Sequence, residues 1–423
     1  MAMARVVGKL RWAGLVVLCA GLIGAGGAWA QGRLARQILP AAPPISRPTE
    51  RVTHSLLQTG PLADYNISSS GMPSISPDER WLVFSPPRQE GKPESVIFHN
   101  LQDRQTWQVN AEHSDKNMLG FVAAWRSDSR ACAVALGGDW LVAEPGVRRV
   151  TQLGRREWEE VAAGWSPKRK LLAFFDTPDF RVWDGRRVSE PVNWAERLGY
   201  PSLASPWRAW DCEWSPDEKF ILLRFYGAAD RTKESPGHLE VINPTTVKKA
   251  GGWGGEGINA HWLDSARIIF LSDNDATRTS YTNMPLVVQA RGRKPVRVLP
   301  QVGWYALSGN RRFIWAWRSG SLYRIDSRTL KRRVVMKSVA DCAYSEARDL
   351  LWVLTKEGAT HIIDSKTLAK RFIGRWSKDD RPSDWRVLGW AKGKPLPLLL
   401  VRQGNSRNAP EIWQLEAPTA GQK

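Results

Sequence analysis

The sequence predicts an all-β protein, an eight-bladed β-propeller of four-stranded antiparallel blades. One observation is a recurring phrase in which an apolar run meets a Ser-Pro-Asp turn and a second apolar run follows, most clearly CEWSPDEKFILLRF at 212–225. Another is that the apolar runs are five to seven residues long and rich in β-branched and aromatic side chains, as expected for strands. A third is the regular spacing of the copies along the chain.

Eight copies of the phrase can be aligned on the residue that precedes each turn. These anchors are Ile75, Trp125, Trp165, Trp214, Trp262, Leu307, Tyr344 and Trp390. Their successive spacings are 50, 40, 49, 48, 45, 37 and 46 residues, the period of four-stranded propeller blades. Each anchor hairpin would supply strands a and b of a blade, and a second hairpin would supply strands c and d.

Residues 1–30 have the pattern of a cleaved signal peptide. Basic residues precede an apolar stretch at 13–27, and Ala28-Trp29-Ala30 places small residues before cleavage at Gln31. An uncleaved N-terminal anchor is the alternative, although the apolar stretch is short for a membrane span. We therefore expect a periplasmic or secreted protein.

The remaining chain divides into a linker, one propeller domain and a tail. Residues 31–51 are rich in proline and should form an extended linker, 52–416 should form the propeller, and 417–423 should be a disordered tail. The last repeat has only three strands, so we expect a strand within 52–57 to supply its fourth. That pairing would close the ring at both termini and remove exposed sheet edges.

The chain has a formal net charge of +19. An exported cation of this size attracts polyanions, and outside the cytoplasm these would be anionic envelope polymers or lipids rather than nucleic acid. A neutral explanation is that many exported proteins are simply basic. Cys132, Cys212 and Cys342 remain after the signal peptide, and we expect each to pack as a small apolar side chain without a disulfide.

The phrase Trp-Ser-Pro-Asp followed by an apolar strand resembles the PD40 repeat of TolB-like and related WD40-like β-propellers. The resemblance is closest at 75–84, 165–175 and 214–225, and weaker in the other five repeats. That family usually has Gly after Asp, where this chain has Glu79 and Glu218. The resemblance implies the architecture and says little about function, because one propeller scaffold serves many functions.

Two further comparisons concern cofactors. The turn at 364–367, Asp-Ser-Lys-Thr, is distantly similar to a turn of the quinoprotein dehydrogenases, but its Gly and an adjacent cysteine pair are missing. The fragment Asp273-Asn274-Asp275 lacks the Gly and distant Glu of a calcium loop, and the six histidines lack ligand spacing. We therefore expect no cofactor and no metal.

The longest connections should lie together on one face, formed by the b-to-c and d-to-a loops. Long loops on a rigid scaffold commonly carry binding sites, so we expect this face to engage a ligand. Most tryptophans follow strand d or end strand a, and this repetition favours wedging between blades. The candidate binding residues are Trp194, Trp207 and Trp210, as an aromatic platform, with Arg231, Lys233, Arg278 and Arg407.

The sequence thus favours a monomeric binding or scaffold module that engages a protein partner or an anionic envelope polymer, with peripheral membrane contact as an option. The alternative is a carbohydrate-active or lyase-type enzyme with carboxylates at the channel mouth. Asp211 and Glu213 are the candidate pair. Hydrolase-elbow and phosphate-loop motifs are absent from the sequence, so no catalytic residue is nominated.

Overall fold

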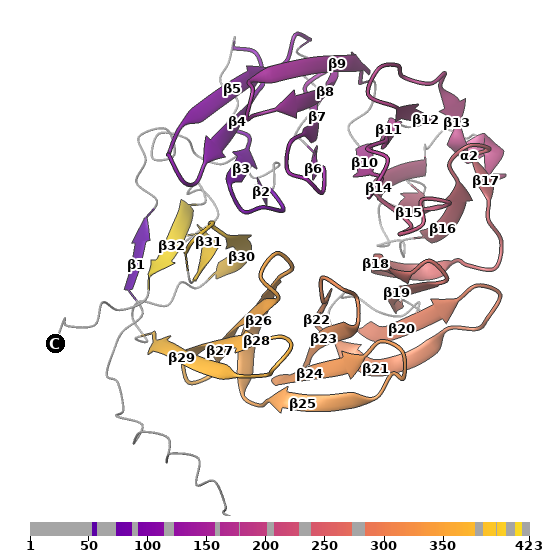
Figure 1. Cartoon of the computed structure of the whole chain (residues 1–423). Coiled ribbons are helices and arrows are strands. Elements are labelled where there is room, and N and C mark those ends of the chain that lie inside the picture. The colour runs from indigo at the N-terminus through magenta and orange to yellow at the C-terminus, as the bar shows by residue number, and fades with distance from the viewer. Residues whose placement is uncertain are drawn as a thin grey trace, which may run out of the picture. The chain divides into compact units, whose positions relative to one another are not determined.

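The computed structural model describes 53–56, 73–86, 92–113, 122–156, 161–176, 178–200, 207–227, 238–272, 284–376, 384–394, 396–402 and 411–416. These residues form eight antiparallel blades arranged in a ring, which confirms the predicted fold class (Figure 1). The first strand of each blade lies at the centre of the ring and the last lies at its outer rim. No helix within the described ranges is long and apolar enough to cross a membrane.

The strands follow the chain in order around the ring. Blade 1 is β2 (Ser74–Ile75), β3 (Trp81–Phe84), β4 (Ser95–Asn100) and β5 (Thr106–Asn110). Blade 2 is β6 (Val122–Trp125), β7 (Cys132–Leu136), β8 (Asp139–Glu144) and β9 (Arg149–Arg155). Blade 3 is β10 (Val161–Trp165), β11 (Leu172–Asp176), β12 (Asp179–Trp183) and β13 (Val192–Asn193). Blade 4 is β14 (Trp207–Trp214), β15 (Ile221–Gly227), β16 (His238–Asn243) and β17 (Lys248–Lys249).

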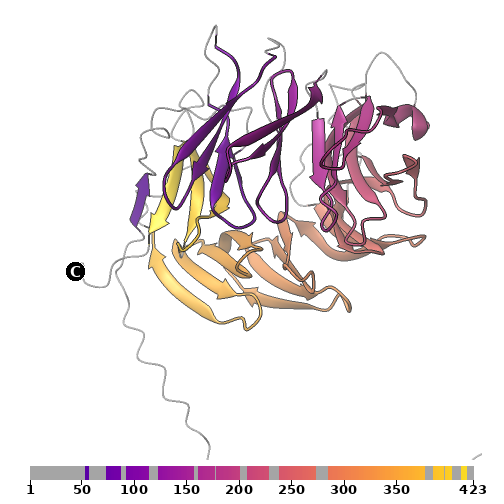
Figure 2. The same cartoon turned by 45° about the horizontal axis from the view of Figure 1, so that its top comes forward.

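The second half of the ring repeats the arrangement (Figure 2). Blade 5 is β18 (Gly255–Asp264), β19 (Arg267–Ser272), β20 (Met284–Ala290) and β21 (Val296–Val302). Blade 6 is β22 (Trp304–Leu307), β23 (Phe313–Arg318), β24 (Ser321–Asp326) and β25 (Arg332–Met336). Blade 7 is β26 (Val339–Ser345), β27 (Leu350–Thr355), β28 (Ala359–Asp364) and β29 (Lys370–Arg375). Blade 8 is β30 (Asp384–Trp390), β31 (Pro397–Arg402), β32 (Glu411–Glu416) and β1 (Thr53–Leu56).

The two ends of the propeller meet in blade 8. Strand β1 pairs antiparallel with β32, with Thr53 opposite Glu416 and Leu56 opposite Trp413. A separate apolar cluster joins blade 8 to blade 1, with Leu398 and Ile412 packed near Leu82 and Phe84. Backbone pairing and side-chain packing therefore both act at the junction where the ring closes.

The core is divided into eight clusters, one at each interface between neighbouring blades. Strand β11 shows how this arises, because all five of its residues are buried. Leu172 and Phe174 pack toward blade 2, whereas Ala173 and Phe175 pack toward blade 4. Successive side chains of a strand point to opposite faces, so each sheet contributes to two clusters.

The tryptophans that follow strand d act as wedges between blades, as the repeated positions predicted. Trp194, Trp253 and Trp376 are at most 8% exposed, and their clusters combine residues of blades 3 and 4, 4 and 5, and 7 and 8. Such large rings bury much apolar area where neighbouring sheets diverge. Trp194 opens α2 (Trp194–Arg197), a single helical turn capped by Asn193.

Indole N–H groups link the inner strands of neighbouring blades. Trp165 donates to the Ala124 carbonyl at 2.9 Å, Trp214 to Gly164 at 2.9 Å and Trp262 to Glu213 at 3.0 Å. In each case the acceptor is the residue immediately before the anchor of the preceding blade. The repeated hydrogen bond therefore fixes the height of one blade against the next.

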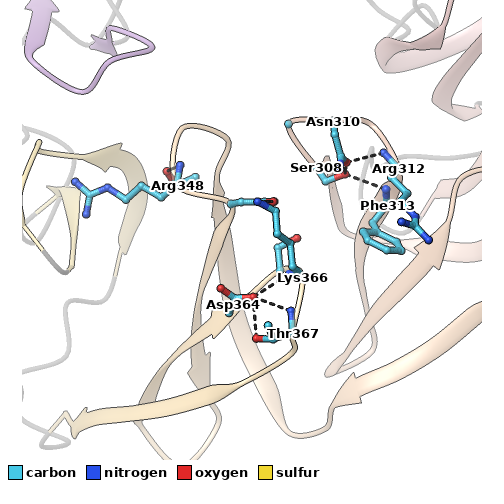
Figure 3. A network of polar contacts seen from close by, with 12 residues as sticks. Ser308, Asn310, Arg312, Phe313, Arg348, Asp364, Lys366 and Thr367 are labelled. Atoms are coloured by element: carbon cyan, nitrogen blue, oxygen red, sulfur yellow. Dashed lines mark hydrogen bonds and ion pairs between the residues drawn. The ribbon is translucent and has the colours of Figure 1, made fainter.

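The a-to-b turns are held by their serines. In blade 6 the Ser308 hydroxyl oxygen accepts from the Phe313 N–H at 2.9 Å, and Asn310 accepts from the Arg312 N–H at 3.0 Å (Figure 3). Ser76, Ser166 and Ser215 accept in the same way from the residue five positions later. The recurring serine is thus explained by hydrogen bonds that define the turn.

Glu79 and Glu218 occupy the turn position where the PD40 pattern has glycine. Both adopt left-handed backbone conformations, with φ of 61° and 59°. Glu218 accepts from the backbone N–H and the Nε of Arg169 in blade 3, each at 2.8 Å. Glu79 accepts from the Ser345 hydroxyl at 2.9 Å and from Arg348 Nε at 2.6 Å in blade 7. The departure from glycine keeps the turn conformation and adds contacts between blades.

The c-to-d turns also follow one rule. Asp364 Oδ1 accepts from the N–H groups of Lys366 and Thr367 at 3.0 and 2.7 Å (Figure 3). Asp326 and Asn243 make the equivalent contacts in blades 6 and 4. Where the quinoprotein turn has glycine, Leu368 has a φ of 63°, so this chain keeps that conformation with a larger side chain.

Blades 4 and 5 differ from the predicted separate sheets. Strand β17 is only two residues long, and the start of β18 pairs with β16 through Gly255 opposite Leu239. The intervening Gly251, Gly252 and Gly254 have positive φ values, which allow the chain to turn sharply at this point. The two blades therefore share one continuous hydrogen-bonded sheet.

Gly164 marks the closest approach of two inner strands and gives a test of this packing. A Cβ at this position would lie 2.5 Å from the Cys212 carbonyl oxygen of the next blade. Overpacking of this kind costs about 1–3 kcal/mol, so Gly164→Ala should lower the free energy of unfolding measured with denaturant by about that amount.

Gly146→Ala is the matched control, because nothing lies within 4 Å of its added Cβ. It should be neutral or stabilising by up to ~1 kcal/mol, through a smaller unfolded-state entropy. Equal effects of the two substitutions would contradict the close approach.

Candidate functional site at the channel mouth

The candidate site is a cavity of about 690 Å³ at the central end of the a-to-b turns. Its wall is formed by the ends of inner strands and by the turns that follow them. The aromatic members are Trp125, Trp165, Trp214, Tyr344 and Trp390. The cavity therefore belongs to the ring as a whole rather than to one blade.

Small residues allow the inner strands of neighbouring blades to approach closely beside this cavity. A Cβ at Gly164 or Gly389 would meet the next blade, at Cys212 and Ile75 respectively. The residue before each anchor is small in six blades, where it is Ser74, Ala124, Gly164, Ala306, Ala343 or Gly389. In the two remaining blades, 4 and 5, it is Glu213 and His261. Two neighbouring ionisable groups thus stand out against six small ones at equivalent positions.

Glu213, His261 and Arg311 form a linked group across blades 4, 5 and 6. Glu213 Oε2 lies 2.9 Å from His261 Nδ1, and Glu213 Oε1 accepts from Arg311 Nη2 at 3.1 Å. Arg311 also donates to the Trp262 carbonyl oxygen. Both carboxylate oxygens of Glu213 therefore have partners supplied by the two following blades.

A second polar group lies next to this one. Arg224 forms an ion pair with Asp211 and donates to Asn259 Oδ1 at 3.3 Å. The Tyr305 hydroxyl contacts the Asn259 carbonyl and lies 3.2 Å from the Ile269 carbonyl oxygen. Burial, the largest influence, raises the pKa of Tyr305 well above its usual value, so the hydroxyl is neutral at physiological pH.

Two carboxyl groups in the cavity have pKa values shifted in opposite directions. Burial tends to raise the pKa of Glu213, but the hydrogen bonds and charges of His261 and Arg311 outweigh it and lower the pKa. Burial raises the pKa of Glu346, and the nearby charge of Glu213 adds to this while Arg311 opposes it. Glu213 is the more strongly ionised partner, and Glu346 retains a proton to higher pH.

Glu346 is the accessible acid of the pair. The surrounding cavity wall partly desolvates its carboxyl group, but the residue still has exposed surface in the turn of blade 7 and lines the cavity. No hydrogen bond or ion pair of its carboxylate joins it to another described residue. Glu213 is held by His261 and Arg311, whereas Glu346 is available to an incoming group. The site thus presents one fixed and one available carboxyl group.

Cys212 also lines the cavity but has no reactive role there. Its side chain is 5% exposed, and burial raises its thiol pKa well above the usual value. A thiol must ionise to act as a nucleophile, so this cysteine packs as a small apolar residue. Cys132 and Cys342 are buried free cysteines as well.

The structure changes the interpretation of the residues nominated from the sequence. Trp194 is 0% exposed and packs against Phe175 and Phe225, so it cannot be part of an exposed aromatic platform. Trp207 and Trp210 lie in β14, the first strand of blade 4. Arg231, Lys233, Arg278 and Arg407 lie outside the described residues, as does Asp273-Asn274-Asp275.

The predicted acid pair separates into two roles. Glu213 does line the cavity, whereas Asp211 pairs with Arg224 and is not part of the lining. His261, Arg311 and Glu346 were not nominated. The position before each anchor would have identified His261, but Arg311 and Glu346 lie in turns of variable sequence. Within the described ranges, no three His, Cys, Asp or Glu side chains are placed to hold a metal ion.

The architecture and its channel define a WD40-like eight-bladed β-propeller. The C-terminal WD40 domain of Sif2 is 11% identical, with 87% of this chain and 98% of that domain aligned and a TM-score of 0.50. An oligogalacturonate lyase in complex with manganese is 10% identical over 87% and 97% of the chains, with a TM-score of 0.48. The oligogalacturonate lyase of Vibrio parahaemolyticus is 11% identical over 88% and 92%, with a TM-score of 0.46.

These similarities show a fold and do not assign an activity. No protein-family model and no curated relative matches the sequence. The likeness to the lyases supports no inference about this chain at these levels of identity and structural overlap.

The opposite pKa shifts predict opposite effects of two isosteric substitutions. The lowered pKa of Glu213 contributes stability that is present above its unfolded value near 4.5 and lost as pH falls through the folded pKa. Glu213→Gln should therefore reduce the free energy of unfolding at pH 7 by about 1–3 kcal/mol, the scale of hydrogen bonds to a charged group.

Glu346→Gln should have the reverse sign. A raised pKa means that ionisation of Glu346 costs stability at pH 7, so the neutral amide should raise the melting temperature there. Both variants should approach the wild type below the folded pKa of Glu213. Thermal unfolding measured from about pH 3 to about pH 7, a range that brackets the carboxyl pKa of the unfolded chain, tests this. Changes in melting temperature of the same sign for the two variants at pH 7 would refute the assignment.

Proposed function

We propose that this protein is a binding and scaffold module that holds a segment of a protein partner at the channel mouth. The observation that supports this is the cavity of about 690 Å³, with Glu346 exposed on its wall. Concave sites with aromatic walls and a few polar groups are typical ligand sites. The rigid ring supplies the shape, and the turns supply the contacts.

A cationic side chain is the group that suits this cavity best. Glu346 is an accessible carboxyl group, and Trp125 and Trp165 line the same cavity. Trp165 already accepts a cation, because the Arg126 guanidinium lies 5.5 Å from its ring centroid. A lysine or arginine of the partner would ionise Glu346 fully and gain a charge-assisted hydrogen bond.

We further propose that the protein acts in the periplasm or outside the cell. The support is the signal-peptide pattern of 1–30, with cleavage between Ala30 and Gln31. The resemblance of the Ser-Pro-Asp turns to PD40 repeats of TolB-like propellers agrees with this location. The face predicted to carry the long loops remains a prediction, because most of those loops lie outside the described residues.

Selection from a random peptide library tests the proposed function. Peptides enriched on the mature protein should contain Lys or Arg, and Glu346→Lys should weaken the best of them at least ~10-fold, because the attraction becomes repulsion. Glu112→Lys supplies a control with the same charge change at an exposed position on another part of the ring. If no peptide is enriched, or if both variants bind equally well, the channel mouth is not the binding site.

A second candidate is a carbohydrate-active or lyase-type enzyme, favoured by the opposite pKa shifts of Glu213 and Glu346. Glu346 would donate a proton, and the Glu213–His261 pair would accept one. Against this, both Glu213 oxygens already have hydrogen-bond partners, His261 and Arg311. Release of reducing ends or of unsaturated products from acidic oligosaccharides, lost in Glu346→Gln, would establish the enzyme instead of the binding module.

A further inference from the structure

The positive charge of this protein is concentrated in one sector of the ring. The c-to-d hairpins of blades 5, 6 and 7 are Met284–Val302, Ser321–Met336 and Ala359–Arg375. Together they contain 13 Lys and Arg residues and 2 acidic residues, a net charge of +11 in a chain of net charge +19. We call these three hairpins the basic sector.

The corresponding hairpins of blades 1 to 4 are almost neutral. They contain 9 basic and 7 acidic residues, a net charge of +2. Edge strands are commonly protected from unwanted pairing by charged side chains. Every blade has an outer edge, however, so protection alone would not place most of the positive charge of these seven hairpins on three consecutive blades.

The two acids of the basic sector do not neutralise it. Asp326 and Asp364 each accept hydrogen bonds from two backbone N–H groups and a threonine hydroxyl of their own turns. Arg324 lies close enough to Arg333 and Arg312 that, after burial, their charges are the main influences lowering its pKa. Like charges therefore accumulate here, which is unfavourable until an anion binds.

Side-chain contacts hold the hairpins of blades 6 and 7 together, and strand b of blade 5 contacts the hairpin of blade 6. Lys370 Nζ in blade 7 donates to the Val335 carbonyl in blade 6 at 2.6 Å. Arg267 in blade 5 donates to the Ser327 carbonyl in blade 6 at 2.7 Å. Strands β21, β25 and β29 follow one another along the outer rim of the ring (Figure 1).

We propose that the basic sector binds a linear polyanion that runs along the rim across blades 5, 6 and 7. The sector follows the curvature of the ring, so a flexible chain can contact all three hairpins, whereas a flat membrane would meet the curved rim at a tangent. Several separate cations favour a ligand with many charges over a small anion. This surface is distinct from the channel mouth and does not depend on the function proposed for it.

The test compares two variants that have the same net charge. The sector variant is Arg297→Gln, Arg332→Gln, Arg333→Gln and Arg371→Gln; these residues are exposed, and their side chains have no hydrogen bond or ion pair to other described residues. The control variant is Arg148→Gln, Arg186→Gln, Arg187→Gln and Lys248→Gln, all exposed in the c-to-d hairpins of blades 2 to 4. Thermal unfolding shows that both are folded, and Arg332→Gln with Arg333→Gln is a milder second variant.

Binding of labelled heparin, used as a model linear polyanion, is measured at about 50 mM and 500 mM salt, on either side of physiological screening. We expect the sector variant to lose at least ~10-fold in affinity at low salt, the milder variant less, and the control under ~3-fold. Equal losses in sector and control variants would show that only net charge matters. The proposal would also be overturned if the protein did not bind heparin. The same holds if the four sector substitutions weakened binding to phosphatidylglycerol vesicles but not binding to heparin.

Discussion

The structure depends on the burial of each blade between two neighbours. A strand such as β11 is buried along its whole length, and its alternate side chains belong to two different apolar clusters. No described blade therefore has a core of its own, because the side chains on each face of a sheet pack against a neighbouring blade. This constraint explains why the chain repeats the same phrase and why its last blade uses β1 from the other end.

The same constraint shapes the channel mouth. Inner strands must approach closely, so the positions before the anchors are mostly Gly, Ala or Ser, and Gly164 leaves no room for a Cβ against Cys212. The anchor tryptophans then reach the preceding blade through their indole N–H groups. Glu213 and His261 are the two large polar groups at this position, and Glu213 also accepts a hydrogen bond from Arg311 of blade 6.

The fold could be predicted from the sequence because it is specified locally and repeatedly. Apolar runs, Ser-Pro-Asp turns and a regular spacing each report on a hairpin, and eight hairpins define the ring. The channel site depends on contacts between blades, which local patterns do not encode. Arg311 reaches Glu213 across 98 positions of sequence, and Glu346 affects the same cavity from a turn without a recurring motif. Trp194 was misjudged for the same reason, since the neighbouring blade buries it.

Native-state hydrogen exchange tests most directly whether the blades are stable only together. If every sheet depends on both neighbours, the amides of the b and c strands of all eight blades should open with one common free energy, equal to that of global unfolding. The exposed outer strands should exchange at lower free energies by local fraying. A group of blades whose b and c strands exchange together at a clearly lower free energy than the rest would show an independent core and contradict this account.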